Sequence, residues 1–145
     1  MNEKTAYNWL KEAVCRGSFD RIDRFENIVG VGNLDVNACI DGAEFWIEIK
    51  APTEPVRPST ALFGSNHKLS QDQKNWIKRQ LKANGNAYIF VATDKRKMLV
   101  HGKWADEFNE MTVSEMITKS MWCAVGRIVS AEQKDDLRNA LIAGF

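Results

Sequence analysis

The sequence feature that most constrains the fold is an Asp-Gly pair, Asp41 and Gly42, which separates two aliphatic runs within residues 34–50. Asp-Gly between alternating apolar residues is the strongest short-range signal for a β-hairpin with a two-residue type I′ turn. Pairing counted outward from this turn brings Asp35 opposite Glu48. The turn therefore sets the register of two strands and places two carboxylates face to face.

Alternation along the two strands divides their side chains between two faces. One face is aliphatic and is expected to be core; it carries Leu34, Val36, Ala38, Ile40, Phe45, Ile47 and Ile49. The opposite face is expected to be polar; it carries Asp35, Asn37, Cys39, Trp46, Glu48 and Lys50.

The charged residues of the second face suggest a specific chemistry. Like charges directly opposed across a strand pair are destabilising, so Asp35 and Glu48 need compensation. Mg²⁺ provides it, because this ion is held by one or two carboxylates together with water and substrate phosphate. Lys50, on the same face, would add a cation where a nucleophilic water or a scissile phosphate sits. We therefore expect a metal and phosphate site; the alternative is an amphipathic hairpin whose charges face solvent.

Periodicity predicts further helices and strands on both sides of the hairpin. Helices are expected at 3–16, 69–83, 112–121 and 131–143, and strands at 20–31, 34–40, 43–50, 87–93 and 97–102. The segment 51–68 contains all three prolines and is expected to be a loop. The order, about αβββαββαα, predicts an α/β (α+β) fold with a central mixed β-sheet flanked by helices.

Two polar residues fall on the apolar faces of predicted helices. Gln73 lies between Trp76 and Ile77 on the wheel of the helix at 69–83, and buried glutamines need partners. It is expected to turn toward the polar face of the sheet. Glu3 lies on the inward stripe of the first helix, where it could supply a third carboxylate.

Composition indicates one globular domain spanning 1–145, with 44% hydrophobic residues. The sequence has neither a long apolar run nor the pattern of a secretory signal, so we expect a cytoplasmic protein without a membrane partner or a nucleotide cofactor. Three scattered cysteines, Cys15, Cys39 and Cys123, argue against disulfides and zinc and are expected to be buried. With a net charge of +1, nucleic-acid binding would depend on local cationic clusters.

The motifs also resemble a known family. Leu34-Asp35, twelve intervening residues and Glu48-Ile49-Lys50 resemble the signature of the PD-(D/E)XK nuclease superfamily, with leucine where the family has proline. The helix start is similar to that of the virus-type replication-repair nuclease (VRR-NUC) group and of phage Holliday junction resolvase-like proteins; it comprises Leu69, Ser70, Gln73 and Trp76. The resemblance covers about residues 22–102 and implies a restriction-endonuclease-like core.

The resemblance implies roles for individual residues. Asp35 and Glu48 would coordinate Mg²⁺, with Mn²⁺ able to substitute, and the Ile49 carbonyl would be a further ligand. Lys50 would activate the attacking water and stabilise charge on the phosphate, with Gln73 as an accessory catalytic residue. Many relatives supply another acidic residue; Glu3 is narrowly favoured here over Glu26, and Glu12 lies off the helix stripe.

DNA contacts are expected from cationic and polar side chains in three places. The proline-rich loop and its continuation, the helix at 69–83 and the basic turn at 95–97 contribute Arg57, Asn66, His67, Lys68, Lys74, Lys78, Lys95, Arg96 and Lys97. For the helix lysines, an ordinary solvated face is an equal alternative.

Together these features predict a metal-dependent endonuclease that hydrolyses DNA, with branched DNA as the favoured substrate. By analogy with resolvases, which cut two strands symmetrically, a homodimer is expected, and the resemblance favours a phage-encoded enzyme acting in the host cytoplasm. Two alternatives stay open: a phage nuclease that nicks or cuts host or competitor duplex DNA, and a catalytically silent DNA-binding module of the same fold.

Overall fold

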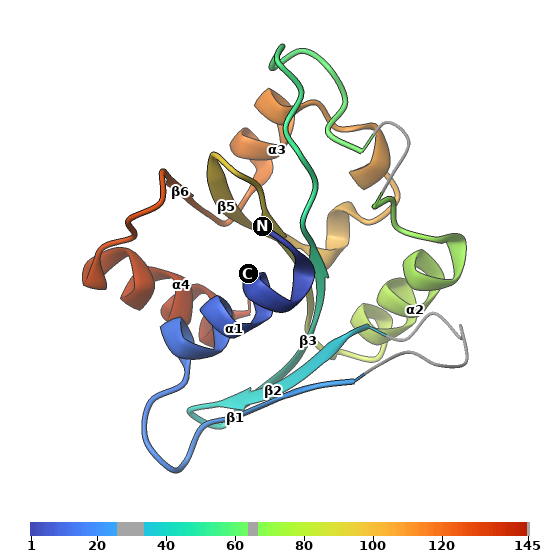
Figure 1. The fold of residues 1–145 in the computed structure, drawn as a ribbon. Helices are drawn as coiled ribbons and strands as arrows, with labels where there is room; N and C mark the ends of the chain where they lie inside the picture. Colours follow the sequence, from blue (N-terminus) through green and yellow to red (C-terminus); the bar gives the residue numbers. More distant parts are fainter. Residues whose placement is uncertain (26–33, 64–66, 145) are drawn as a thin grey trace.

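The computed structural model describes residues 1–25, 34–63 and 67–144, which fold around a mixed β-sheet (Figure 1). Its strands are β1 (Arg21–Arg24), β2 (Val36–Ile40), β3 (Ala43–Lys50), β4 (Ala87–Ala92), β5 (Arg96–His101) and β6 (Trp122–Val125). The helices are α1 (Glu3–Val14), α2 (Gln71–Lys82), α3 (Val113–Lys119) and α4 (Ala131–Ala143), with 3₁₀ turns η1 (Gly102–Trp104) and η2 (Phe108–Glu110). The strands lie side by side in chain order. Among the described strands, β3 and β4 alone are parallel neighbours, and α2 connects them.

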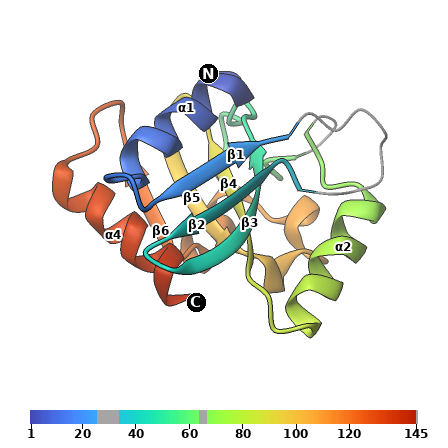
Figure 2. The same cartoon turned by 90° about the horizontal axis from the view of Figure 1, so that it is seen from below.

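Helices cover both faces of this sheet (Figures 1 and 2). On one face α1 and α4 lie together, and Leu10 and Leu137 share a buried cluster with Phe45. On the other face α2, α3 and the 3₁₀ turns bury a second cluster, which includes Ile77 and Met116. Central strands are thus enclosed from both sides, and every residue of β4 is buried and none is charged.

The hairpin turn agrees with its prediction. Asp41 and Gly42 both have positive φ, 48° and 81°, as a type I′ turn requires. Ile40 pairs with Ala43 directly beside the turn, so the register counted from the sequence is confirmed.

At the far end of the hairpin the same register brings the two predicted carboxylates together. The ladder continues to Val36 opposite Ile47. Asp35 is the next residue along, and its backbone N–H donates to Glu48 Oε1 at 3.3 Å.

The face predicted to be polar is not open to solvent, so the alternative of an amphipathic hairpin with solvated charges is wrong. The α2 helix covers the polar face, where the Trp46 and Trp76 ring centroids lie 5.3 Å apart. Glu48 and Lys50 are consequently buried, with 3% and 7% of their surface exposed. Leu34, assigned to the aliphatic face, belongs to the cluster under α2.

The element order differs from the prediction by one strand. The short β6, Trp122–Val125, follows α3 and pairs with β5, so the observed order is αβββαββαβα with the 3₁₀ turns set aside. The helix predicted at 112–121 ends earlier, at Lys119, and its N-cap is Thr112. A four-residue edge strand is too short for periodicity to separate from the end of a helix.

Element ends differ in smaller ways. The first strand is described only to Arg24, and the remainder of the predicted strand at 20–31 lies largely outside the described residues. Beyond α2 the left-handed residue is Asn84, with φ 63°. Asparagine tolerates that conformation better than most residues.

The proline-rich segment 51–68 forms neither helix nor strand in its described residues, apart from a bridge between Ala61 and Thr112. It is held to the fold by Glu54, whose buried carboxylate accepts hydrogen bonds from Thr93 Oγ1 and Arg96 Nε. The three cysteines are half-buried, less than expected. Across the described ranges, no helix combines the length and apolarity needed to cross a membrane.

Candidate active site

The candidate site is built around the buried carboxylate of Glu48, near the end of β3. Its Oε2 accepts a hydrogen bond from Gln73 Nε2 at 2.8 Å and lies 3.3 Å from Lys50 Nζ. Its Oε1 accepts from the backbone N–H of Asp35. Both oxygens are therefore engaged, and the structure brings together the four predicted catalytic residues, Asp35, Glu48, Lys50 and Gln73.

Gln73 is oriented by the helix that it begins. Ser70 caps α2, and its hydroxyl accepts from the Gln73 backbone N–H at 3.1 Å. The Gln73 side-chain oxygen in turn accepts from the Ser70 N–H at 3.0 Å. This capping box leaves the amide nitrogen of Gln73 free to point at Glu48. The Leu-Ser-x-x-Gln motif thus specifies a helix start and a contact to the carboxylate at once.

Lys50 extends between the sheet and the segment before α2. Its ammonium donates to the Lys68 carbonyl oxygen at 3.2 Å and pairs with Glu48. A buried ammonium needs such partners because the free ion loses its hydration on burial. Lys68, predicted as a DNA contact through its side chain, therefore also contributes its backbone to the site.

Asn109 of η2 is a site-supporting residue that the sequence did not reveal. Its side-chain oxygen accepts from the Leu69 N–H at 2.8 Å, and its nitrogen donates to the Leu69 carbonyl at 2.9 Å. The amide thus clamps the residue that lies between Lys68 and the Ser70 cap. No motif marked it, because the asparagine and its partner are far apart in sequence.

The electrostatics of the two carboxylates differ from those of surface acids. Burial, with the nearby Asp35 charge second, raises the pKa of Glu48 to about 8. The pKa of Asp35 is raised as well, first by burial and then by the charge of Glu3, while the Ile49 N–H opposes the shift. The Lys50 ammonium lowers the pKa of both carboxyls but does not outweigh burial and the neighbouring acids, and a divalent cation would relieve this imbalance.

The remaining predicted metal ligands are less well placed. Glu3, at the start of α1, is near enough to act on Asp35, but its Oε1 lies 3.9 Å from His67 Nδ1. No group of three or more His, Cys, Asp or Glu side chains is arranged to hold a metal within the described part of the chain. Glu26 lies outside the described residues, and Glu12 is exposed on α1. The Ile49 carbonyl stays a prediction.

The predicted DNA contacts fall into separate groups. Arg57, His67 and Lys68 are exposed in the segment between β3 and α2, and Asn66 lies outside the described residues. Arg96 is different: its Nε donates to the buried Glu54 carboxylate at 2.8 Å, so it anchors the loop. The charge of Arg96 is thus already paired inside the fold, and its DNA contact stays a prediction.

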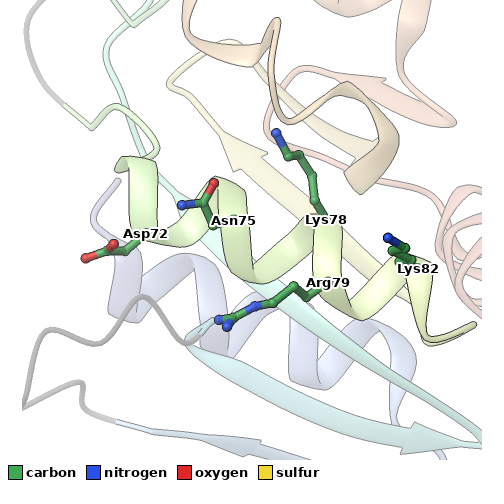
Figure 3. A pocket seen from close by; sticks show the side chains of 5 residues that line it. All are labelled: Asp72, Asn75, Lys78, Arg79 and Lys82. Atoms are coloured by element: carbon green, nitrogen blue, oxygen red, sulfur yellow. The ribbon is translucent and has the colours of Figure 1, made fainter.

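Along α2 the exposed face carries a basic stripe beside a cavity of about 480 Å³ (Figure 3). The lining residues are Asp72, Asn75, Lys78, Arg79 and Lys82. Lys78 pairs with Asp106 at 3.1 Å, while the predicted Lys74 is half-buried and does not line this cavity.

Comparison with known proteins identifies a solved structure of similar fold. No protein-family model and no curated protein matches the sequence. Among solved structures, Hjc, a Holliday junction resolvase from the archaeal hyperthermophile Archaeoglobus fulgidus, is similar with a TM-score of 0.53 and 14% identity. The match covers 92% of this chain and 95% of that chain. The predicted fold class, a mixed sheet flanked by helices with a restriction-endonuclease-like core, is thereby confirmed.

Proposed function

We propose that this chain is a divalent-metal-dependent endonuclease that hydrolyses phosphodiester bonds in branched DNA. The observation that carries the proposal is the buried Glu48 carboxylate, held by Gln73 and Lys50 and facing Asp35. The similarity of the fold to a Holliday junction resolvase supports branched DNA as the substrate class.

The residues present fit a divalent cation. Asp35 and Glu48 would hold Mg²⁺, or Mn²⁺ in its place, with the Ile49 carbonyl as a further ligand and Glu3 as the nearest additional acid. Bound there, such an ion supplies Lewis-acid stabilisation of the phosphate and a more acidic water. Burial, with a neighbouring carboxylate second, raises the pKa of both carboxyls, and a bound cation would favour their charged forms.

The protein's own groups have distinct tasks in this scheme. Gln73 occupies one oxygen of Glu48 and thereby fixes the rotation of the carboxylate. Lys50, held by the Lys68 carbonyl, keeps its ammonium beside the reacting phosphate and stabilises the negative charge that develops on it. His67 and Lys68 are exposed, and the Lys68 carbonyl contacts Lys50. We therefore expect these two side chains to contact flanking phosphates.

In the decisive experiment, the purified protein is incubated with Mg²⁺ and, in parallel, with each of four substrates: a four-way junction, a flap, a linear duplex and a single strand. We expect symmetric cuts in the junction and no cutting when a chelator is present. Glu48→Ala and Lys50→Ala should abolish cutting, while circular dichroism shows that both variants keep the fold. Normal cleavage by either variant would show that the site is wrongly assigned.

The same experiment separates the alternatives. Equal cutting of the linear duplex would favour a nuclease that attacks host or competitor DNA, and tight binding without cutting would favour a silent binding module. Burial of Glu48 and Lys50 speaks against the silent module, because burying charges costs stability that DNA binding alone does not require.

Two finer points belong to the proposal. Symmetric cutting of a junction requires two active sites, so a homodimer is expected, and sedimentation of the protein with and without a junction tests it. A phage source rests on the sequence resemblance.

A further inference from the structure

A second buried lysine, Lys97, lies on the opposite face of the sheet from Lys50. It is the second residue of β5, and only 4% of its surface is exposed. Its ammonium is 4.8 Å from the centroid of the Trp9 ring. Within the described residues no carboxylate or carbonyl oxygen accepts a hydrogen bond from it, which sets it apart from Lys50.

Lys97 lines a cavity of about 350 Å³. Trp9 forms one wall and is itself fixed by stacking on Phe90, with centroids 5.9 Å apart and an interplanar angle of 11°. At the mouth lies the exposed guanidinium of Arg127, which follows Gly126 in its left-handed conformation of φ 91°. The ammonium end of a largely buried lysine, an indole ring and a guanidinium border one space.

The charge around this cavity is mainly positive. Lys134 of α4 is near enough that, after burial, its charge also lowers the pKa of Lys97. Asp94 is the one acidic residue described in the lining, and it is exposed. The Lys97 ammonium keeps contact with solvent, because no side-chain nitrogen among the described residues is both fully buried and unpaired. A cavity with this balance of charge favours an anion, which would replace that solvent.

The cavity lies at the same end of the sheet as the candidate active site. Lys50 is paired with Val91 of β4, and Lys97 with Ala92, the next residue of that strand. Lys50 and Lys97 are thus two strands apart, about 10 Å across the sheet. Met1 lines the cavity, while Glu3 acts on Asp35, so the start of α1 borders both sites.

We propose that the Lys97 cavity binds a backbone phosphate of the DNA strand, a few nucleotides from the bond that is cut. The inference rests on the proposed nuclease function, because that function brings a chain of phosphates to this end of the sheet. The backbones of the two lysines lie about 10 Å apart and their side chains leave the sheet on opposite faces, so at about 3.4 Å of rise per nucleotide the two phosphates are at least about three nucleotides apart. The aromatic wall allows a nucleoside of the same strand to lie against Trp9.

Salt-dependent binding of a labelled four-way junction in chelator, read by fluorescence anisotropy, tests this contact. Lys97→Met is expected to weaken binding about 5- to 20-fold and to reduce the slope of log affinity against log salt by about one, as loss of one phosphate contact does. Lys11→Met, an exposed lysine near the other end of α1, is the matched control and should change affinity less than about 2-fold. Asp94→Asn should strengthen binding, because it removes the carboxylate.

Arg127→Gln is a second test variant that should not disturb folding, since this residue is exposed. Like Lys97→Met, it should weaken binding of the junction. If both variants bind the junction with wild-type affinity and salt slope, the proposal is overturned.

Titration with inorganic phosphate, dAMP and a short single strand, followed by tryptophan fluorescence, identifies the source of the phosphate. Tightest binding of the single strand, lost in Lys97→Met, supports a DNA-backbone contact. Tightest binding of dAMP would assign the cavity to a free nucleotide and overturn it. The two proposals can fail separately. Junction cleavage together with wild-type binding by Lys97→Met would overturn only the proposal for the cavity. Lys97-dependent binding of the strand without any cleavage would overturn only the nuclease function.

Discussion

The two faces of the sheet treat a buried lysine in opposite ways. Under α2, the Lys50 ammonium has both a carboxylate and a carbonyl oxygen as partners. Under α1, the Lys97 ammonium has an aromatic ring and a cavity. A buried charge is costly without partners. The partners of Lys50 are therefore typical of a preassembled centre, whereas the surroundings of Lys97 fit a site where a bound ligand supplies the partner. Burial alone therefore does not distinguish catalytic from binding lysines, but their partners do.

The largest expected effect separates the two lysines directly. Lys50→Met should lower the rate of junction cleavage at saturating protein by about 10³-fold, the loss expected when a charge that stabilises the transition state is removed. Lys97→Met should leave that saturated rate within about 3-fold, since a remote phosphate contact acts through binding. Single-turnover kinetics with Mg²⁺ give both numbers. Equal losses would place Lys97 in the catalytic centre and remove the contrast.

The next prediction concerns pH and the carboxylates beside Lys50. Burial raises the pKa of Glu48 from 4.5 to about 8, so between these values the unfolded chain has lost a proton that the native chain keeps. Stability without metal should therefore fall as pH rises through this window, by about 1–3 kcal/mol. Urea unfolding in chelator at pH 5 and pH 8.5 measures the change. Glu48→Gln should flatten it; a wild-type curve that rises with pH would contradict the shift.

Gln73 offers a matched comparison with α4, which begins with the same kind of capping box, formed by Ser130 and Gln133. Gln73→Ala and Gln133→Ala should each cost about 1 kcal/mol of unfolding free energy through the lost cap. Only Gln73→Ala should also slow cleavage, by about 10- to 100-fold, because it alone contacts Glu48. Similar rates in both variants would mean that Gln73 acts as a cap and nothing more.

The smallest expected effect is that of Asn109. Asn109→Ala removes both hydrogen bonds to Leu69 and should slow cleavage about 3- to 10-fold by loosening the segment that holds the Lys50 ammonium. Asn75→Ala, exposed on α2, is the control and should leave the rate unchanged. Binding of the junction should be unaffected in both, which anisotropy checks.

Local rules of the chain were enough to predict the hairpin and much of the site. The Asp41-Gly42 turn set the register, and that register alone placed Asp35 beside Glu48. Gln73 was found from its position on the apolar side of a helix, because a buried amide requires a partner. These inferences succeeded because each depended on one turn or one helix.

Features that depend on packing between distant segments were missed. The sequence left open whether the polar side of the hairpin faces solvent or is covered, since no local pattern says which helix covers which face. Asn109 gave no signal, and Lys97 was expected only as one cation of the basic turn at 95–97, because the clamp and the cavity form only when separate elements meet. Arg96 looked like a free cation for the same reason, and Glu54 pairs with it across the fold.

The capping box of α2 couples folding of that helix to assembly of the site. Because the Gln73 side chain closes the first turn and holds Glu48 at once, fraying of the turn releases the carboxylate in the same event. Local opening of α2 is thus a reversible off state for the centre, with a population set by the strength of one helix start. Hydrogen exchange at the Ser70 and Gln73 amides would report the fraction of molecules ready to react.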